Sequence, residues 1–391
     1  MGTLFLLMSL PGFEPAPNQV RLTKKLLEGV KEYAKHWPGK VTLMMPPGEM
    51  HSGNLDDIII ERSSLPFTVD ILDFASADLR EKIADAGLVL GGSHPAISGL
   101  AKHCKIRDIP YIFVTEYTLK TRLQILKTEV KNPFKLLRRT IWELREEYRT
   151  LSKVKYASGI QCNGTPTFDA YQHHNKEALL YFDNRIDTEL LSSIGKITEK
   201  CTSRSLEKPM QLAFSGRLNR MKGAHQLIPI AQRLCAKKLP FHLHIFGEGP
   251  LSTDIATAIQ KNKLEHCVTY HGTVDFREHL VPFISKNIDI FICPHLQGDP
   301  SCTYIETFAC GVPILGFANE ALSGILKIHP CGWSAPIGNI EKIVSQLELL
   351  YRDPQEIERA AKSALEFATE NTFAITFSKR ISQMIKLSKQ S

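Results

Sequence analysis

The side chains best suited to chemistry lie in the second half of the chain, between Ala213 and Leu315. Arg217 follows a short apolar run, Gly216 stands directly before it, and Lys222 comes five residues later. Arginine offers a planar fork of donors for a phosphate, lysine a mobile point charge, and glycine a close approach of backbone to ligand. Such side chains could hold a phosphate and stabilise charge that grows on a leaving oxygen.

A strand and a helix would have to position these cations. Residues 213 to 218 indicate a short strand that runs into a turn, and residues 223 to 236 carry apolar side chains at helical spacing. The amino end of such a helix carries partial positive charge and favours an anion. Without further motifs, both cations would be interpreted as solvated charges at a strand–helix corner.

A second group of candidates surrounds Glu306, which lies near the start of a predicted helix that ends at Gly311. A carboxylate at this place can accept hydrogen bonds from two sugar hydroxyls. The turn before it offers hydroxyl groups and backbone amides to a phosphate, and its candidate binding residues are Asp299, Ser301, Cys302 and Thr303. Asp299 or Ser301 could instead serve only as a helix cap.

Further short motifs accompany these residues in a fixed order, namely 245 to 250 (IFGEGP), 271 to 274 (HGTV), 289 to 294 (DIFICP) and 306 to 314 (ETFACGVPI). Together with the two cations, they resemble the C-terminal half of a family 4 glycosyltransferase of the GT-B fold. The resemblance implies an α/β protein with two Rossmann-like domains whose parallel sheets face a central cleft. It also implies retaining transfer of a sugar from a nucleotide-diphosphate sugar, without a cofactor or a bound metal.

The resemblance assigns roles to particular residues. It places Glu306 on the ribose of the donor, and Gly247, Gly249 and Val274 near the nucleotide. The family usually carries another glutamate eight positions before Glu306, where this chain has Gly298. The first acid is therefore missing or displaced by one residue to Asp299. This departure keeps open a catalytically weak subunit that only binds a nucleotide sugar, and a nucleotide-sugar epimerase is a third possibility.

The first half offers two candidate catalytic residues, His94 and Glu116. Each follows a predicted strand, at the carboxyl edge where open α/β sheets gather their ligands. The family often has a histidine near the second of these positions, and this chain has Glu116. His94 could equally cap a helix or pack in a core, and Glu116 could be a solvated loop acid.

Length and patterning favour two domains. Short continuous apolar runs at 41 to 45, 87 to 90 and 111 to 114 suit strands buried in parallel sheets. The expected divisions are an acceptor-side domain over 1–191, a linker over 192–207, a nucleotide-sugar-binding domain over 208–370, and a last helix over 371–391 that crosses back to the first domain.

Residues 120 to 155 concentrate positive charge. They carry eleven cations and four anions, so their net charge of +7 equals that of the whole chain. Phe134, Leu137 and Trp142 are interleaved with the cations, which is typical of a helix on an anionic membrane surface. A solvated helix face is the alternative. We expect no nucleic-acid partner, because no such motif accompanies the charge.

The remaining features bear on location. The nine cysteines form no Cys-x-x-Cys pair, which favours free thiols in a reducing cytoplasm over disulfides or a zinc site. The apolar residues 3 to 10 predict a first buried strand rather than a secretion signal. We expect a cytoplasmic enzyme, peripheral at the inner face of the membrane, that acts on a sugar or lipid-linked acceptor.

Overall fold

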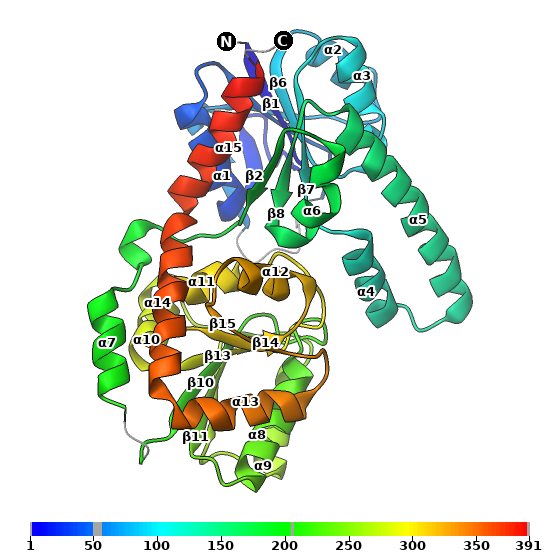
Figure 1. The fold of residues 1–391 in the computed structure, drawn as a ribbon. Helices are drawn as coiled ribbons and strands as arrows, with labels where there is room; N and C mark the ends of the chain where they lie inside the picture. Colours follow the sequence, from blue (N-terminus) through cyan, green and yellow to red (C-terminus); the bar gives the residue numbers. More distant parts are fainter. Residues whose placement is uncertain (1, 50–56, 205–206, 389–391) are drawn as a thin grey trace.

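Figure 1 shows a computed structural model, which describes residues 2–49, 57–204 and 207–388. Two α/β units lie one above the other, and each is built around its own sheet. This arrangement confirms the predicted class of two domains with parallel sheets.

The sheet of the first domain has seven strands in the order β5-β3-β1-β6-β7-β8-β9, and every neighbouring pair is parallel. The strands are β1 (Thr3–Leu7), β3 (Val41–Met45), β5 (Thr68–Ile71), β6 (Ala86–Gly91), β7 (Tyr111–Thr115), β8 (Gly159–Asn163) and β9 (Ala178–Tyr181). The apolar residues 3 to 7 therefore form the interior strand β1, with Leu4 and Leu6 fully buried, as predicted.

The sheet of the second domain has six strands in the order β12-β11-β10-β13-β14-β15, again all parallel. They are β10 (Met210–Ser215), β11 (Phe241–Phe246), β12 (Val268–Gly272), β13 (Ile290–Cys293), β14 (Ile314–Phe317) and β15 (Gly332–Ala335). A small antiparallel pair, β2 (Gln19–Thr23) with β4 (Asp57–Glu61), stands beside the first sheet. Because parallel strands end at one edge, the loops after β10, β12 and β13 lie at the same side of the second domain.

Helices cover both sheets. Those of the first domain are α1 (Lys24–His36), α2 (Asp78–Lys82), α3 (Leu100–Ile106), α4 (Leu119–Glu129), α5 (Pro133–Tyr156) and α6 (Gly164–Tyr171). The later ones are α7 (Ile194–Thr202), α8 (Leu227–Ala236), α9 (Ser252–Lys261), α10 (Val281–Asn287), α11 (Thr303–Ala309), α12 (Glu320–Ile328), α13 (Ile340–Arg352), α14 (Pro354–Glu370) and α15 (Phe373–Ser388). In the described residues, none of the helices is long and apolar enough to cross a membrane.

The structure differs from the sequence-based expectations at the helix after β10 and at the linker. The helix predicted over 223 to 236 begins only at Leu227, because Gly223 is left-handed (φ 68°) and residues 224–226 form a single 3-10 turn. The expected linker 192–207 contains helix α7, which packs against α14. The domain limits themselves stay a prediction.

The last helix returns to the first domain. Apolar side chains of α15 complete the core beneath the first sheet, namely Phe377, Ile381, Met384 and Leu387. On the same helix, the buried Arg380 donates to Gln161 on β8 (Nε to Oε1, 2.8 Å) and stacks over Tyr181 (4.2 Å). The chain therefore crosses between the domains more than once. The packing of α15 against the first domain helps to fix the position of one domain relative to the other.

Candidate active site

A cavity of about 1230 Å³ lies between the two domains and collects most of the predicted site residues. The first domain contributes the start of α1 and residues 183 to 187, and the second contributes the end of β10 and the turn before α11. The predicted residues that line this cleft are Glu116, Gly216, Lys222, Asp299, Ser301, Cys302, Thr303 and Glu306.

Lys222 is held against the turn before α11. Its Nζ lies 2.6 Å from Oδ2 of Asp299 and donates to Oγ of Ser301 (3.2 Å), which in turn donates to Thr303 (3.1 Å). The other carboxylate oxygen of Asp299 is buried and finds no hydrogen-bond partner among the described residues. The first residue of α11 is preceded by Cys302, without a side-chain cap, so neither Asp299 nor Ser301 caps this helix.

The backbone next to Lys222 explains why a glycine follows it. An added Cβ at Gly223 would lie 1.8 Å from the carbonyl oxygen of Pro294, and the residue has a left-handed φ of 68°. Only glycine adopts this conformation without strain at such close approach. The turn is therefore pressed against the end of β13, which aims Lys222 into the cleft.

Glu306 lies in the first turn of α11 and faces a residue that the sequence analysis did not select. Its Oε1 accepts a hydrogen bond from Nε of Arg185 (2.9 Å), whose guanidinium lies 4.0 Å from the ring centroid of Phe276. Arg185 belongs to the segment that follows β9 in the first domain. An acid of one domain and a cation of the other thus meet across the cleft.

Lys25 and Asp183 are two further residues that sequence reasoning missed. Their side chains pair at 2.6 Å, and Nζ of Lys25 also lies 3.7 Å from Sγ of Cys302. Burial alone would disfavour the ammonium, but Cys302 and Asp183 outweigh it and raise the pKa of Lys25. No motif in the sequence analysis marked Lys25 or Asp183.

Glu116 follows β7 and lies on the wall that the cleft shares with a second cavity of about 580 Å³ in the first domain. Desolvation and the nearby charge of Asp183 raise the pKa of Glu116, against the opposite effects of Lys25 and Arg380. Most of the lining of this second cavity is apolar, with Leu7, Met8, Leu10, Leu26, Val30 and Val114 among its residues.

Two predicted catalytic residues lie outside the lining of the cleft. Nδ1 of His94 accepts from the amide of Ala96 (3.3 Å), and its ring packs edge-on against Phe74, so the side chain caps a local 3-10 turn. Burial lowers its pKa, which favours the neutral ring. Arg217 follows the cleft residue Gly216 directly, and its side chain is exposed.

The remaining predicted positions near the nucleotide also lie outside this lining. Added Cβ atoms at Gly247 and Gly249 would meet backbone oxygens of Gly216 (2.1 Å) and Leu218 (2.6 Å). These two glycines therefore pack the loop after β11 against the turn after β10. Val274 is half-buried against the core of the second domain.

The structure explains the glycine at position 298. A Cβ there would lie 2.9 Å from Cβ of Glu320, and the Gly298 carbonyl accepts from Thr121 of α4 (3.3 Å). A longer side chain would collide with the start of α12 or displace α4. Asp299 points to Lys222 and lines the cleft.

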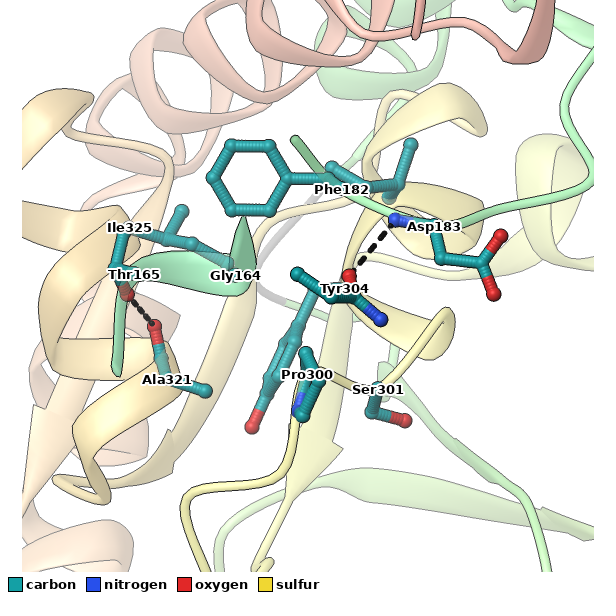
Figure 2. A pocket seen from close by; sticks show the side chains of 11 residues that line it. Gly164, Thr165, Phe182, Asp183, Pro300, Ser301, Tyr304, Ala321 and Ile325 are labelled. Carbon is teal, nitrogen blue, oxygen red and sulfur yellow. Dashed lines mark hydrogen bonds between the residues drawn. The ribbon is translucent and has the colours of Figure 1, made fainter. Parts of the chain in front are cut away.

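The domains touch directly around a small pocket that shares Asp183, Pro300 and Ser301 with the cleft (Figure 2). Gly164, at the start of α6, lies so close to Pro300 that an added Cβ would come within 2.8 Å of its ring. Beside it, Oγ1 of Thr165 donates to the carbonyl of Ala321 (3.4 Å). The amide of Asp183 donates to Asn163 (3.1 Å). These contacts hold the turn at 299 to 303 next to the segment that carries Asp183 and Arg185.

Comparisons with known proteins agree with this geometry. Residues 197–367 match the family model described as glycosyl transferases group 1. Over the whole chain, the fold is similar to Anabaena HepE in complex with UDP (TM-score 0.66, 15% identity, 99% of this chain and 100% of that one). It is also similar to the lipopolysaccharide outer core galactosyltransferase WaaB (TM-score 0.67, 11% identity, 99% of both chains).

Among curated proteins, the putative colanic acid biosynthesis glycosyltransferase WcaL of Salmonella typhimurium is 23% identical over 166 residues, 40% of each chain. The D-inositol 3-phosphate glycosyltransferase of Arthrobacter sp. is 27% identical over 173 residues, 42% of this chain and 41% of that protein. The chain thus aligns with about two fifths of the length of these relatives.

The chain has two domains with parallel sheets that face one cleft, and it is similar over its full length to the solved structures of HepE and WaaB. These features define a protein of the GT-B fold. Within the second domain, residues 197–367 match the glycosyl transferases group 1 model, and the curated relatives that align there are named as glycosyltransferases.

Proposed function

We propose that this protein is a retaining glycosyltransferase that moves a sugar from a nucleoside diphosphate sugar to an acceptor hydroxyl. The observation that carries the proposal is the cleft in which Lys222, held by Asp299, and Glu306, held by Arg185, lie among the hydroxyls of the 299 to 303 turn. HepE was solved with UDP, and several relatives are named for polysaccharide biosynthesis, which supports a similar donor and product class.

In this proposal the second domain holds the donor. Lys222 and the rim residue Arg217 contact the diphosphate and stabilise the charge of the departing oxygen, while Glu306 accepts the ribose hydroxyls. The turn at 299 to 303 adds hydroxyl and amide donors. The bond from the sugar to the diphosphate oxygen breaks as the acceptor oxygen bonds to the same face of the sugar, and the acceptor's hydroxyl proton passes to the departing diphosphate oxygen.

The acceptor would enter from the first domain. Glu116 and Lys25 both line the boundary between the cleft and the second cavity, so they are placed to contact an acceptor hydroxyl. The apolar lining of that cavity fits an acceptor with an apolar part, such as a lipid-linked sugar.

The test is donor turnover. A panel of nucleotide sugars is first screened by thermal shift, because a ligand that binds the native state raises its Tm. Release of free diphosphate is then measured with and without candidate acceptors. Lys222→Ala is expected to lower turnover by about 100-fold or more, whereas Lys237→Ala, on an exposed side chain at the end of α8, should leave it unchanged.

The alternatives predict different products. A catalytically weak binding subunit would show the thermal shift without diphosphate release under any acceptor, and Gly298 in place of the family glutamate is the observation that favours it. A nucleotide-sugar epimerase would convert the donor into its isomer in the absence of an acceptor. Either result would contradict the proposed transfer.

We also propose that this enzyme is cytoplasmic and attaches peripherally to an anionic membrane through α5. Figure 1 shows the α4–α5 hairpin projecting from the body of the first domain. Exposed apolar side chains recur along α5 at intervals of three and four, which places them on one face, and they are Phe134, Leu137, Ile141, Leu144 and Tyr148. Phe134 is 84% exposed and Tyr148 is 78% exposed. A group of large exposed apolar side chains on one face marks a surface for a partner or a membrane.

The charges of the hairpin support an anionic partner. The acids Glu143 and Glu147 point inward and both pair with Arg122 at 2.8 Å, which leaves the outer surface of α5 rich in exposed cations. These cations are Lys135, Arg138, Arg139 and Arg145, of which Arg138 and Arg145 lie beside the apolar face and Lys135 and Arg139 lie farther round the helix. Each is worth roughly 1 kcal/mol near an anionic bilayer, and salt screens it. Like charges on this face would also oppose pairing with a second copy.

Co-sedimentation with vesicles tests the attachment. We expect binding to phosphatidylglycerol-containing vesicles at low salt, and loss of binding after joint neutralisation of Lys135, Arg138 and Arg139. Phe134→Ser with Leu137→Ser should also abolish it, whereas Ile106→Ser, an exposed apolar residue on α3, should not. Failure of the unaltered protein to bind at low salt would leave α5 as a solvated face and would not affect the proposed transfer.

A further inference from the structure

Two cysteines and a histidine gather at the far end of the second domain. Cys235 lies in the last turn of α8, and His266 and Cys267 directly precede β12. Their ligand atoms, two sulfurs and a ring nitrogen, all lie within 4.8 Å of one another. The two cysteines are 32 positions apart in the sequence, so no spacing motif marks them.

The distances fit tetrahedral coordination. The sulfurs of Cys235 and Cys267 are 3.6 Å apart, far longer than a disulfide bond of about 2.05 Å. Two thiolates that share a tetrahedral zinc at about 2.3 Å each would lie about 3.8 Å apart. Because two thiols in simple contact would be separated by a similar distance, the imidazole of His266 beside both sulfurs is what distinguishes a metal site.

The backbone around these ligands is held independently of any ion. The amides of Cys267 and Val268 both donate to the carbonyl of Leu264 (2.9 and 2.8 Å), which closes the turn before β12. The carbonyl of Cys267 accepts from Leu243 on β11 (2.8 Å), which fixes the turn to the sheet. Such a preformed turn lowers the ordering cost of binding an ion.

We infer that Cys235, His266 and Cys267 form a binding site for a thiophilic divalent cation of the zinc class. Two sulfurs and one imidazole match the ligand preference of Zn²⁺, and the exposed His266 leaves the fourth position open to water. The site lies at the amino edge of the parallel sheet, opposite the cleft at its carboxyl edge. Figure 1 places α8 at the end of the second domain away from the first. The ion would therefore clamp α8 to β12 and take no part in sugar transfer.

Cobalt titration of the full chain tests this site. The protein, reduced and freed of metal by a chelator, is titrated with Co²⁺, whose absorption reports thiolate ligands and tetrahedral geometry. We expect one ion per chain, displacement by Zn²⁺, and a higher Tm with Zn²⁺. Cys235→Ser and His266→Ala should each weaken binding by about tenfold or more.

Two controls keep the result interpretable. His266 is exposed, so His266→Ala tests the site without disturbing the core, unlike replacement of the buried Cys267. Cys302→Ser removes a partly accessible thiol in the cleft and should leave Co²⁺ binding unchanged. The inference is wrong if no stoichiometric thiolate band appears, or if the band survives in Cys235→Ser. It is also wrong if the two cysteines are found in a Cys235–Cys267 disulfide and the protein takes up no metal after that disulfide is reduced.

Discussion

The pair of Lys222 and Asp299 allows catalysis and stability to be separated in one experiment. Their charged atoms lie 2.6 Å apart, and only 18% and 11% of the two side chains are exposed. Breaking a buried pair by removing one partner costs roughly 3–5 kcal/mol, because the remaining charge stays buried without compensation. Allowing for the residual exposure of this pair, we expect Lys222→Met to lower the free energy of unfolding by about 2–4 kcal/mol.

The loss should be recovered when both charges are removed. Lys222→Met combined with Asp299→Asn leaves no unpaired charge, so its free energy of unfolding should return to within about 1 kcal/mol of the unaltered protein. Turnover should stay low in the double variant, by about 100-fold, because the Lys222 ammonium no longer stabilises the departing diphosphate. Urea unfolding and diphosphate release from the same samples provide the two readouts.

A matched pair on the surface serves as the control. Lys237 and Glu348 also form an ion pair, but their side chains are 37% and 29% exposed, so their coupling should be about 0–1 kcal/mol. If the stability losses of the Lys222 and Asp299 variants simply add to within about 0.5 kcal/mol, the two charges are not coupled. If turnover recovers together with stability, Lys222 is a structural residue and its role in phosphate binding is wrong.

Three further predictions concern other residues of the second domain. Glu306→Gln should weaken nucleotide binding with little change in Tm; unaltered affinity by calorimetry would reduce Glu306 to a partner of Arg185. Gly298→Glu should not restore the missing acid but should cost about 1–3 kcal/mol, measured by thermal denaturation, because its Cβ meets Glu320. Burial and two neighbouring histidines lower the pKa of His244 to about 4. Since an unfolded histidine titrates near 6.5, stability should be full above pH ~6.5 and fall by about 1–2 kcal/mol toward pH ~4 for this half-buried ring. If a His244→Gln variant loses as much free energy of unfolding between pH ~6.5 and pH ~4, measured by urea unfolding, His244 is not the cause of the pH dependence.

Local patterning determined the elements of this protein. The apolar runs at 41 to 45 and 111 to 114 became β3 and β7 of the first sheet, because a strand buried on both faces needs apolar side chains at every position. The turn after β10 was also predictable, since Gly216, Arg217 and Lys222 are neighbours in the sequence. The family resemblance rested on the same short-range spacings.

Local patterning was less reliable where one residue had two possible partners. His94 was expected to be equally suited to catalysis or capping, and its position beside Ala96 and Phe74 gives it a local contact outside the cleft lining. Asp299 was expected either to cap α11 or to bind a ligand, and it pairs with Lys222. Asp299 found its partner 77 positions away in the sequence, whereas His94 found one only two positions away, and local patterning did not decide between such partners.

The sequence by itself determined which segments become strands and helices and where Arg217 and Lys222, the cations proposed to bind phosphate, lie along the chain, because both depend on residues a few positions apart. Only the tertiary structure decided which side chains face one another across the cleft. Arg185 and Glu306 are 121 residues apart, and Lys25 and Cys302 are 277 apart, yet each pair is in contact. Their meeting depends on strand order and on how the domains pack together, and no local spacing records either.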